Sequence, residues 1–198
     1  EQKIDPYLLG FLIADGSLSN NFGISNSEED VLKKISDKLS IYSYGIKHRN
    51  GPDWDCVRLD NRKFNQHTAV NTLPQLIKYY GINTQSHNKH IPSQYLYASV
   101  EDRLEILRGL FDGDGYIDKN GQYEYTTSRK HLSQDFSFLV RSLGIVDVVS
   151  SNSASYTNSA GEKINCRTSY CHRLKVPNDL IIFSSKKHTS RRKLKQNN

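Results

Sequence analysis

Methionine is absent from this chain of 198 residues, and cysteine occurs only three times. An odd number of cysteines does not form a complete disulfide framework, so we expect a reducing intracellular environment, whose compartment the sequence leaves open. Cys166, Cys171 and His172 could suggest zinc, but their spacing is unusual and no fourth ligand is evident. We therefore expect these residues to occupy strand positions.

Long apolar runs are also missing. No segment approaches the roughly 20 apolar residues that a membrane-spanning helix needs. The first five residues include charges and no long apolar segment follows them, so we expect neither a signal peptide nor a membrane partner. Hydrophobic residues make up 36% of the chain and the mean hydropathy is −0.66. These values are typical of a water-soluble globular protein that is long enough to bury a core.

The charge balance is basic. Lysine and arginine number 27 against 21 aspartates and glutamates, which gives a net charge of +6, and the calculated isoelectric point is about 9.1. An excess of positive charge is typical of proteins that bind nucleic acids, but many proteins of other classes carry as much. Composition alone therefore indicates a polyanionic partner only weakly.

An internal repeat is the strongest signal in the sequence. Residues 8–16 read LLGFLIADG, and residues 107–115, which begin 99 positions later, read LRGLFDGDG. Shorter matches follow in the same order: 45–46 with 144–145, 56–59 with 171–174, and 86–90 with 184–188. Because the order is preserved, we expect two similar units, over residues 1–97 and 98–198.

Each unit is predicted to read α-β-α-β-β-α. Asp5 and Pro6 are typical of a helix start before the first repeated segment, and Ser99 with Asp102 resembles a capping box before the second. The other expected elements come in pairs, one in each unit: strands at 21–25 and 122–126, amphipathic helices at 28–39 and 130–143, and hairpins at 46–59 and 145–176. The first unit adds a helix at 72–80, whose counterpart in the second unit is expected to be shorter, near 178–183.

Each predicted repeat helix carries a glycine on its apolar face, Gly10 in one copy and Gly109 in the other. A glycine inside a helix costs about 1 kcal/mol relative to alanine, so something must offset it. Close approach of two helix backbones would do so, because only a missing side chain allows it. We therefore expect the two repeat helices to pack against each other around a pseudo-twofold axis.

The aspartates that end these helices, Asp15 and Asp114, are more informative. A carboxylate at a helix C-terminus opposes the helix dipole, and two of them brought together also repel each other. A locally unfavourable choice made twice indicates function. A divalent cation such as Mg²⁺ bound between the carboxylates would make their proximity favourable instead of repulsive. It could also activate water for phosphodiester hydrolysis. A single Asp-Gly turn would mean little, since that dipeptide is common in turns.

At this point both segments resemble the LAGLIDADG motif of homing endonucleases, in the single-chain form with two copies. The first copy has Ile13 where the family often has an acidic residue, and the second keeps Asp112 and Asp114. The resemblance implies an α+β fold of two pseudo-symmetric αββαββα-type units. Each unit has an antiparallel saddle-shaped sheet, and the units pack through their motif helices.

The resemblance also implies an activity. It implies cleavage of both strands of a DNA target of roughly twenty base pairs, or two turns of B-DNA, leaving 3′ overhangs. Cleavage would depend on Mg²⁺ or Mn²⁺, whereas Ca²⁺ is expected to bind without supporting cleavage. The metal ligands that it implies are the carboxylates of Asp15 and Asp114 and the preceding backbone carbonyls of Ala14 and Gly113.

Further catalytic residues are carried over from the resemblance. The position near the attacking water falls on Asn26 and, in the second unit, on Thr127, which departs from the Gln or Asn of the family. A lysine beside the scissile phosphate falls on Lys89 and on Lys187, which follow the last motif aspartates by 74 and 73 residues. The neighbouring Lys186 competes with Lys187 for the second position.

The expected DNA contacts lie on the hairpin strands, where polar and basic side chains alternate along predicted sheet faces. A solvated sheet face is the alternative interpretation, and the basic tail near the C-terminus is expected to touch phosphate. The expected contact residues are Lys47, Arg49, Arg58 and Arg62 in the first unit, and Ser151, Ser153, Ser155, Arg167, Ser169, Arg173 and Lys186 in the second.

Three functions are compatible with these patterns. The favoured one is a monomeric, site-specific DNA endonuclease encoded within an intron or intein. The second is a non-cleaving LAGLIDADG maturase or regulator that binds RNA or DNA, and the retention of both motif aspartates and both late lysines weighs against it. The third, a generic basic binding module, does not explain the two misplaced carboxylates.

Overall fold

The structure, a computed structural model, describes residues 4–19, 22–60, 72–84, 88–186 and 189. The elements of the first unit are α1 (Pro6–Asp15), β1 (Gly16–Ser17), β2 (Gly23–Ser25), α2 (Glu29–Ser40), β3 (Tyr44–Asn50), β4 (Asp53–Arg58), α3 (Leu73–Tyr79) and α4 (Ser93–Leu96). Those of the second are α5 (Val100–Asp114), β5 (Gly115–Ile117), β6 (Tyr123–Thr127), α6 (Lys130–Ser142), β7 (Val146–Asn152), β8 (Ser155–Thr157), β9 (Lys163–Asn165) and β10 (Ser169–Lys175).

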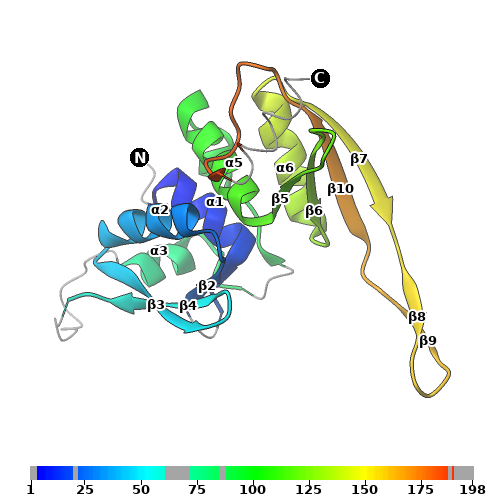
Figure 1. Cartoon of the computed structure of the whole chain (residues 1–198), viewed down its shortest axis with the longest axis horizontal. Helices are drawn as coiled ribbons and strands as arrows, with labels where there is room; N and C mark the ends of the chain where they lie inside the picture. Colours follow the sequence, from blue (N-terminus) through cyan, green and yellow to red (C-terminus); the bar gives the residue numbers. More distant parts are fainter. Residues whose placement is uncertain (1–3, 20–21, 61–71, 85–87, 187–188, 190–198) are drawn as a thin grey trace.

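Both units follow the same plan, which confirms the predicted α+β fold of two similar halves. The first sheet has the strand order β1-β2-β4-β3 and the second has the order β5-β6-β10-β7, and all of their strand pairs are antiparallel. In Figure 1, α1 and α5 lie in the middle of the molecule, with the first sheet at the lower left and the second at the right. One hydrophobic core runs through both units.

The motif helices begin as their sequences predict. The side chain of Asp5 accepts a hydrogen bond of 3.1 Å from the backbone N–H of Leu8, and that of Ser99 accepts one of 3.1 Å from the N–H of Asp102. Each helix ends at its motif aspartate, and the next glycine begins a short strand, β1 or β5. These two short strands and the helix α4 were not predicted.

Gly10 and Gly109 bring α1 and α5 into backbone contact. A Cβ atom on Gly10 would lie within 3.0 Å of the carbonyl oxygen of Ile106, and one on Gly109 would lie equally close to the carbonyl oxygen of Tyr7. No real Cβ tolerates such a distance, so the close approach requires glycine at both positions. The predicted packing of the two repeat helices is confirmed.

A buried polar network fixes α6 on the second sheet. Ser133 Oγ lies 2.9 Å from Nε2 of His172, whose Nδ1 lies 3.1 Å from Oδ1 of Asp147. Ser137 on the same helix donates to Oδ2 of Asp147 at 2.6 Å. All of these groups are at least partly buried, so the network joins α6, β7 and β10 inside the unit. His172 and Cys171 thus occupy strand positions, as expected, whereas Cys166 follows the end of β9 and lies outside a strand.

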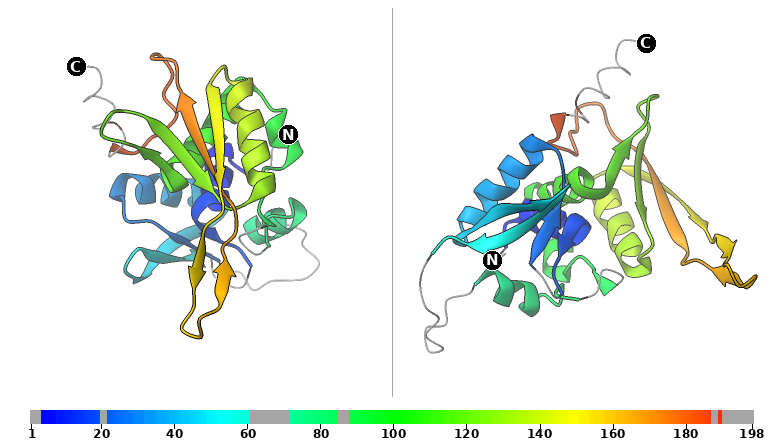
Figure 2. Two further views of the ribbon diagram at one scale, coloured as in Figure 1. Left: turned by 90° about the vertical axis from the view of Figure 1, so that its right-hand side faces the viewer. Right: turned by 60° about the horizontal axis from the view of Figure 1, so that its bottom comes forward.

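The second hairpin extends beyond its sheet as a narrow ribbon formed by β8 and β9. Between the last pair of the sheet, Asn152 with Ser169, and the first pair of the ribbon, Ser155 with Asn165, two residues on one strand oppose three on the other. This extra residue is a β-bulge, which re-aims the strands. Figures 1 and 2 show the ribbon projecting away from the rest of the protein.

Across the described residues, no helix has the length and apolar character to span a bilayer.

Candidate active site at the seam between the two units

The carboxylates of Asp15 and Asp114 meet where α1 and α5 end. A Cβ atom on Gly113 would lie 2.6 Å from Cβ of Ala14 and 3.4 Å from Oδ2 of Asp15, so the glycine makes room for the opposite helix end. The negative charge of Asp114 also raises the pKa of Asp15. The two motif aspartates therefore lie close together at the seam between the units.

Both carboxylates titrate above the usual range for aspartate. Burial, and secondly the charge of Asp114, raise the pKa of Asp15 to about 6. Asp114 is exposed, yet protein atoms around its carboxyl group displace enough water to raise its pKa as well, against the opposing charges of Arg129 and Lys89. Two carboxylates that are disfavoured as anions gain from binding a cation.

Lys89 is fully buried at the end of α1. Its ammonium group donates to the carbonyl oxygens of Leu12 at 2.9 Å and Ile13 at 3.2 Å, and also to that of Gly16. Such carbonyls at a helix C-terminus carry the negative end of the dipole. Burial and the neighbouring charge of Arg129 lower the pKa of Lys89 to about 8, against the opposing influence of the two carboxylates.

Arg129 is a second cation at this seam, and sequence reasoning did not assign it to the site. It precedes α6 in the second unit, and its Nη1 donates to the carbonyl oxygen of Ile13 in the first unit at 2.9 Å. Its charge lowers the pKa values of Asp15 and Asp114. The one signal in the sequence is that Arg129 occupies the position in the second repeat that Glu28 occupies in the first, so the charge at this position is reversed.

The two residues predicted to lie near the attacking water, Asn26 and Thr127, differ from each other in their contacts. Oδ1 of Asn26 accepts from the backbone N–H of Glu28 at 2.9 Å, which leaves Nδ2 to donate to Oδ2 of Asp15 at 3.3 Å. Thr127 is buried, and its hydroxyl accepts from the backbone N–H of Arg129 at 3.2 Å. Asn26 thus contacts its motif aspartate, whereas Thr127 shapes the turn into α6.

Tyr125 is another residue that the sequence did not reveal. It lies on β6 opposite Gly115, its ring stacks on Phe136, and it is completely buried. Its hydroxyl has no hydrogen-bond partner among the described residues. Burial and the charge of Asp114 raise its pKa. A buried hydroxyl without a partner is costly, and no hydrogen bond from the described residues offsets this cost at Tyr125.

Asp112, the other acidic residue of the second motif, binds the C-terminal segment rather than the seam. Its carboxylate accepts hydrogen bonds from the hydroxyl of Tyr7 at 2.8 Å, from the backbone N–H of Ser184 at 2.9 Å and from that of Ser185 at 3.1 Å. Burial raises its pKa despite these bonds. Asp112 thereby ties the segment that leads to Lys186 to both motif helices.

A narrow cleft of about 250 Å³ opens beside the end of α5. Its lining joins both units, since it combines the end of β2 and the first hairpin turn with the end of α5 and the C-terminal segment. The lining residues are Ser25, Asn26, Ser27, Glu28, Pro52, Asp112, Gly113, Gly115 and Ser185. The cleft thus borders Gly113 and Gly115, which flank Asp114 in the chain, but neither Asp15 nor Asp114 lines it.

The donor set at the seam fits a hard divalent cation. Within the described residues, no cluster of three or more acidic, histidine or cysteine side chains converges, so Asp15 and Asp114 are the charged ligands on offer. Mg²⁺ suits such a site, because it is commonly held by one or two carboxylates together with waters and substrate phosphate. The backbone carbonyls of Ala14 and Gly113 directly precede these two residues in the chain.

The predicted DNA contacts of the first unit lie on opposite faces of its sheet. Lys47 pairs with Asp55, and Arg49 forms an ion pair with the same carboxylate, so both lie on the sheet face that is turned away from the helices. Arg58 instead pairs with the buried Tyr44 and therefore lies on the opposite face, where it contacts Asp60. Arg58 thus lies on a different face of the sheet from Lys47 and Arg49. Arg62 lies outside the described residues.

The second sheet separates its predicted contacts in the same way. Ser169 and Arg173 lie on the face turned away from α6, where Arg173 forms an ion pair with Glu124. Ser151 pairs with Tyr170 and so lies on the other face, which is turned toward α6. The remaining predicted contacts are spread over the ribbon and its base, at Ser153, Ser155 and Arg167.

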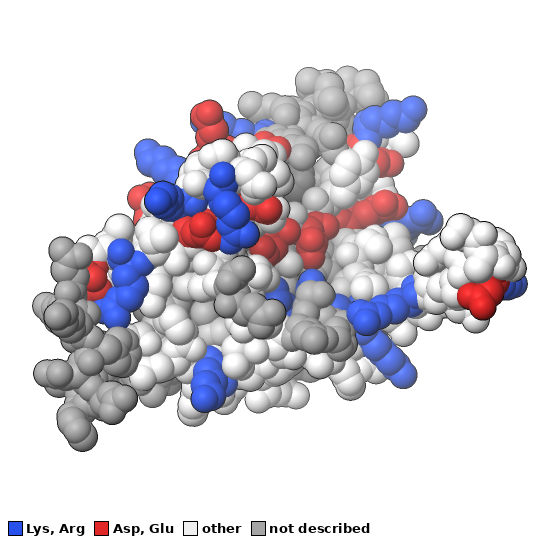
Figure 3. Space-filling view, turned by 90° about the horizontal axis from the view of Figure 1, so that it is seen from below, with Lys and Arg blue, Asp and Glu red and all other residues white. Residues whose placement is uncertain are grey.

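The basic C-terminal segment is described only in part. Lys186 is exposed, and its backbone N–H donates to Asp30 at 2.7 Å. Lys187 lies outside the described residues. In Figure 3, which shows the underside, lysine and arginine side chains are scattered, and carboxylates form a band among them. The positive charge predicted from composition is therefore distributed rather than gathered into one patch on this face.

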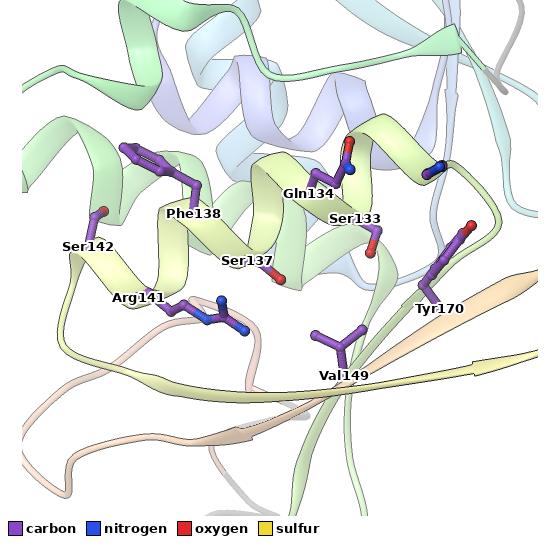
Figure 4. A pocket seen from close by; sticks show the side chains of 9 residues that line it. Ser133, Gln134, Ser137, Phe138, Arg141, Ser142, Val149 and Tyr170 are labelled. Carbon is purple, nitrogen blue, oxygen red and sulfur yellow. The ribbon is translucent and has the colours of Figure 1, made fainter.

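A second hollow, of about 610 Å³, lies between α6 and the second sheet (Figure 4). Ser133, Ser137 and Arg141 line it from the helix, and Val149 and Tyr170 line it from the strands. Two of these serines belong to the network that fixes α6, so the polar lining follows from the packing of the unit. Neither motif aspartate borders this hollow.

Comparison with known proteins identifies the fold. Residues 101–189 match the family model described as a LAGLIDADG-like domain. The crystal structure of I-DmoI in complex with DNA and Ca superposes with a TM-score of 0.54 at 10% identity, covering 94% of this chain and 95% of that one. The chain has the two-motif LAGLIDADG fold. Mesophilic variants of the homing endonuclease I-DmoI match similarly, with a TM-score of 0.52 at 13% identity over 94% of this chain and 95% of theirs.

Curated relatives match this chain over short segments of much longer proteins. The replicative DNA helicase DnaB of Mycobacterium intracellulare is 26% identical over 144 residues, 73% of this chain and 20% of that protein. The ATP-dependent DNA helicase Hel308 of Thermococcus kodakarensis is 33% identical over 69% of this chain and 12% of its own length. A probable translation initiation factor IF-2 of Methanocaldococcus jannaschii is 27% identical over 71% and 12%. The chain thus spans a fifth or less of these relatives.

Proposed function

We propose that this LAGLIDADG protein is a site-specific double-strand DNA endonuclease that acts as a monomer and hydrolyses phosphodiesters with Mg²⁺ or Mn²⁺. The observation that carries the proposal is the meeting of Asp15 and Asp114 at the seam, where both are disfavoured as free anions. A single chain supplies both halves of the site, so a second copy is not required. The LAGLIDADG fold, shared with a DNA-bound homing endonuclease, supports DNA as the partner.

The residues around the seam have distinct parts in this proposal. When bound, a divalent cation neutralises phosphate charge and lowers the pKa of a nearby water. Asn26, locked by its own backbone contact, orients the carboxylate of Asp15. Lys89 and Arg129 hold fixed positive charge beside the place where a phosphate would develop negative charge during cleavage, a pre-organised arrangement that needs no further reorganisation.

We further propose that the chain is the endonuclease part of an intein rather than an intron product. Its curated relatives include two DNA helicases and a probable translation initiation factor, proteins with unrelated tasks. A segment that recurs in such different proteins, and covers only 12% to 20% of each, behaves as a translated insertion. An intron-encoded protein would not be part of its host polypeptide.

The test is digestion of a randomised duplex library by the purified chain with Mg²⁺, followed by sequencing of the ends. The proposal predicts cuts at one related set of sites with 3′ overhangs, and retained binding without cutting when Ca²⁺ replaces Mg²⁺. Sequence-selective binding of DNA or RNA with no cut product in Mg²⁺ or Mn²⁺ would favour the non-cleaving alternative.

A further inference from the structure

The outer strands of the two sheets differ in how well they are protected against pairing with another chain. An outer strand exposes backbone N–H and C=O groups, and proteins commonly shield it by keeping it short or by placing charged side chains on it. β1 and β5 have only two and three residues, and β3 carries Lys47, His48 and Arg49 along its exposed part. β7, the remaining outer strand, has neither form of protection.

β7 presents apolar side chains and outward backbone groups at its edge. It has seven residues, pairs with β10 alone among the described strands, and its one charged side chain, that of Asp147, is buried. Val148 and Val149 are 54% and 40% exposed. Alternate residues of an outer strand turn their backbone groups away from the neighbouring strand. The carbonyl of Asp147 belongs to this outward set, because it accepts from Arg141 on α6 at 3.5 Å, and Val149 and Ser151 follow at steps of two.

The hollow of about 610 Å³ between α6 and the second sheet lies beside this edge, and we call it the α6–β7 groove (Figure 4). Phe138 on the helix and Val149 on the strand give it apolar walls. Its volume lies in the range of ligand-binding pockets. A helix beside an open sheet edge allows an extended peptide to add as a further strand, with every second side chain entering the groove.

The charges around the groove favour an acidic occupant. Lys130 and Arg141 are the charged residues that line it, and they stand near opposite ends of α6. Arg141 remains 60% exposed although its guanidinium lies 3.8 Å from the buried carboxylate of Asp147. The rise of an α-helix places the two cations about 16 Å apart along its axis. The groove therefore offers positive charge at both ends and no negative side chain among its lining residues.

An extended peptide matches this spacing in a definite pattern. Its residues rise about 3.3 Å each and alternate between faces, so two side chains four positions apart share a face at about 13 Å. Carboxylates at these positions can meet Lys130 and Arg141, whose long side chains bridge the remaining distance. The residue midway between them faces Phe138 and Val149, which suit an apolar side chain. The groove thus fits the pattern acidic, any, apolar, any, acidic.

We propose that β7 and the α6–β7 groove form a binding site for an extended acidic segment of a partner protein, which adds as a strand to the second sheet. A second copy of this chain fits less well, because edge-to-edge pairing would bring two sets of Lys130 and Arg141 together. A nucleic acid carries the required charge but has no peptide backbone to pair with β7. Neither motif aspartate borders the groove, so this inference does not depend on the proposed function.

The first experiment selects peptides from a displayed library of short random sequences on the immobilised full chain. The proposal predicts enrichment of peptides with two acidic residues four positions apart and an apolar residue midway. The affinity of a selected peptide is then measured by fluorescence anisotropy. A groove variant that combines Lys130→Gln and Arg141→Gln should bind it at least tenfold more weakly. A control with the same charge change at exposed lysines outside the groove, Lys33→Gln with Lys119→Gln, should bind within twofold of the unaltered protein.

If the groove variant does not fold, Lys130→Gln alone is compared with Lys33→Gln, and it should still weaken binding at least threefold. Absence of enrichment, enrichment of peptides without the acidic pattern, or equal binding by groove variant and control would overturn the proposal.

The second experiment tests the pairing of the two backbones. Two forms of the selected peptide carry N-methyl groups on opposite sets of alternate residues. An added strand uses the N–H groups of one set only, so one form should bind at least tenfold more weakly and the other within threefold of the unmodified peptide. Equal loss in both forms would overturn strand addition.

Two further results would assign the groove to another occupant and so overturn the acidic partner. One is displacement of the peptide by a single-stranded oligonucleotide whose own binding is lost in the groove variant. The other is a dimer of the unaltered chain, seen by light scattering, that the peptide dissociates.

Discussion

Arg129 of the second unit donates a hydrogen bond of 2.9 Å to the carbonyl oxygen of Ile13, on the motif helix of the first unit. This contact joins the two halves at the seam and fixes a cation near both motif aspartates. We predict that Arg129→Gln lowers the single-turnover cleavage rate about 100-fold, the usual effect of removing one pre-organised donor. Binding should change less than threefold. Arg129→Lys should recover part of the rate, and a wild-type rate in Arg129→Gln would remove this residue from the site.

The raised pKa of Asp15 predicts a pH-dependent instability of the metal-free protein. Its pKa rises from 3.8 to about 6 on folding, so the folded state binds this proton more tightly than the unfolded chain. The resulting stability is complete below pH 3.8 and is lost as the pH rises to about 6. We therefore expect Asp15→Asn to stabilise the chelated protein at pH 7 by about 1–2 kcal/mol.

Urea denaturation in a chelator at several pH values measures this effect. The exposed Asp37 on α2 provides a matched control, because Asp37→Asn makes the same chemical change away from the seam. The control should leave the free energy of unfolding within about 0.5 kcal/mol of the unaltered protein. Equal stability of Asp15→Asn and the unaltered protein at pH 7 would show that the carboxylate is not strained.

The backbone contact at Gly109 predicts a loss of stability on a substitution that normally favours helices. Gly109→Ala gains about 1 kcal/mol of helix propensity, but its methyl group would press on the carbonyl oxygen of Tyr7. Overpacking of this kind costs about 1–3 kcal/mol or more, so we expect net destabilisation. Thermal denaturation checks it, with Lys33→Ala at an exposed position of α2 as control. A higher melting temperature for Gly109→Ala would contradict the close packing.

The carboxylate of Asp112 predicts how the C-terminal segment is held. Asp112→Ala removes the acceptor for the N–H groups of Ser184 and Ser185. We expect amide hydrogen exchange at these two residues to quicken at least tenfold, while exchange in α6 stays unchanged. Asp37→Ala is the control. Unaltered protection at Ser184 would mean that other contacts hold the segment.

Repetition explains how much of this site the sequence could predict. Gly10 and Gly109, or Asp15 and Asp114, are each locally unfavourable, and their recurrence at one position of a repeat indicates a shared cause. Arg129 could not be identified in this way, because the equivalent residue of the first repeat is Glu28 and because its contact is made only across the seam. Tyr125 escaped because an unpaired buried hydroxyl can be recognised only after the core is packed.

The sequence did not show which face of each sheet every candidate DNA contact occupies, for a physical reason. Alternation within a strand tells which residues share a face, but the register with the neighbouring strand decides which face is buried. Arg58 pairs with Tyr44 and Ser151 with Tyr170, which turns both toward the helix side. The sequence analysis assigned the compensation of the paired carboxylates to a divalent cation, whereas Lys89 and Arg129 already supply part of it.

The most direct test of the central claim compares the unaltered protein with Asp15→Asn and Asp114→Asn on the selected target. Single-turnover cleavage of each strand in Mg²⁺ and the dissociation constant in Ca²⁺ are measured on the same preparations. If the two carboxylates hold the cation that cuts DNA, each variant binds within a few-fold of the unaltered protein but no longer makes a double-strand break. Double-strand cutting at the wild-type rate by either variant would contradict the account.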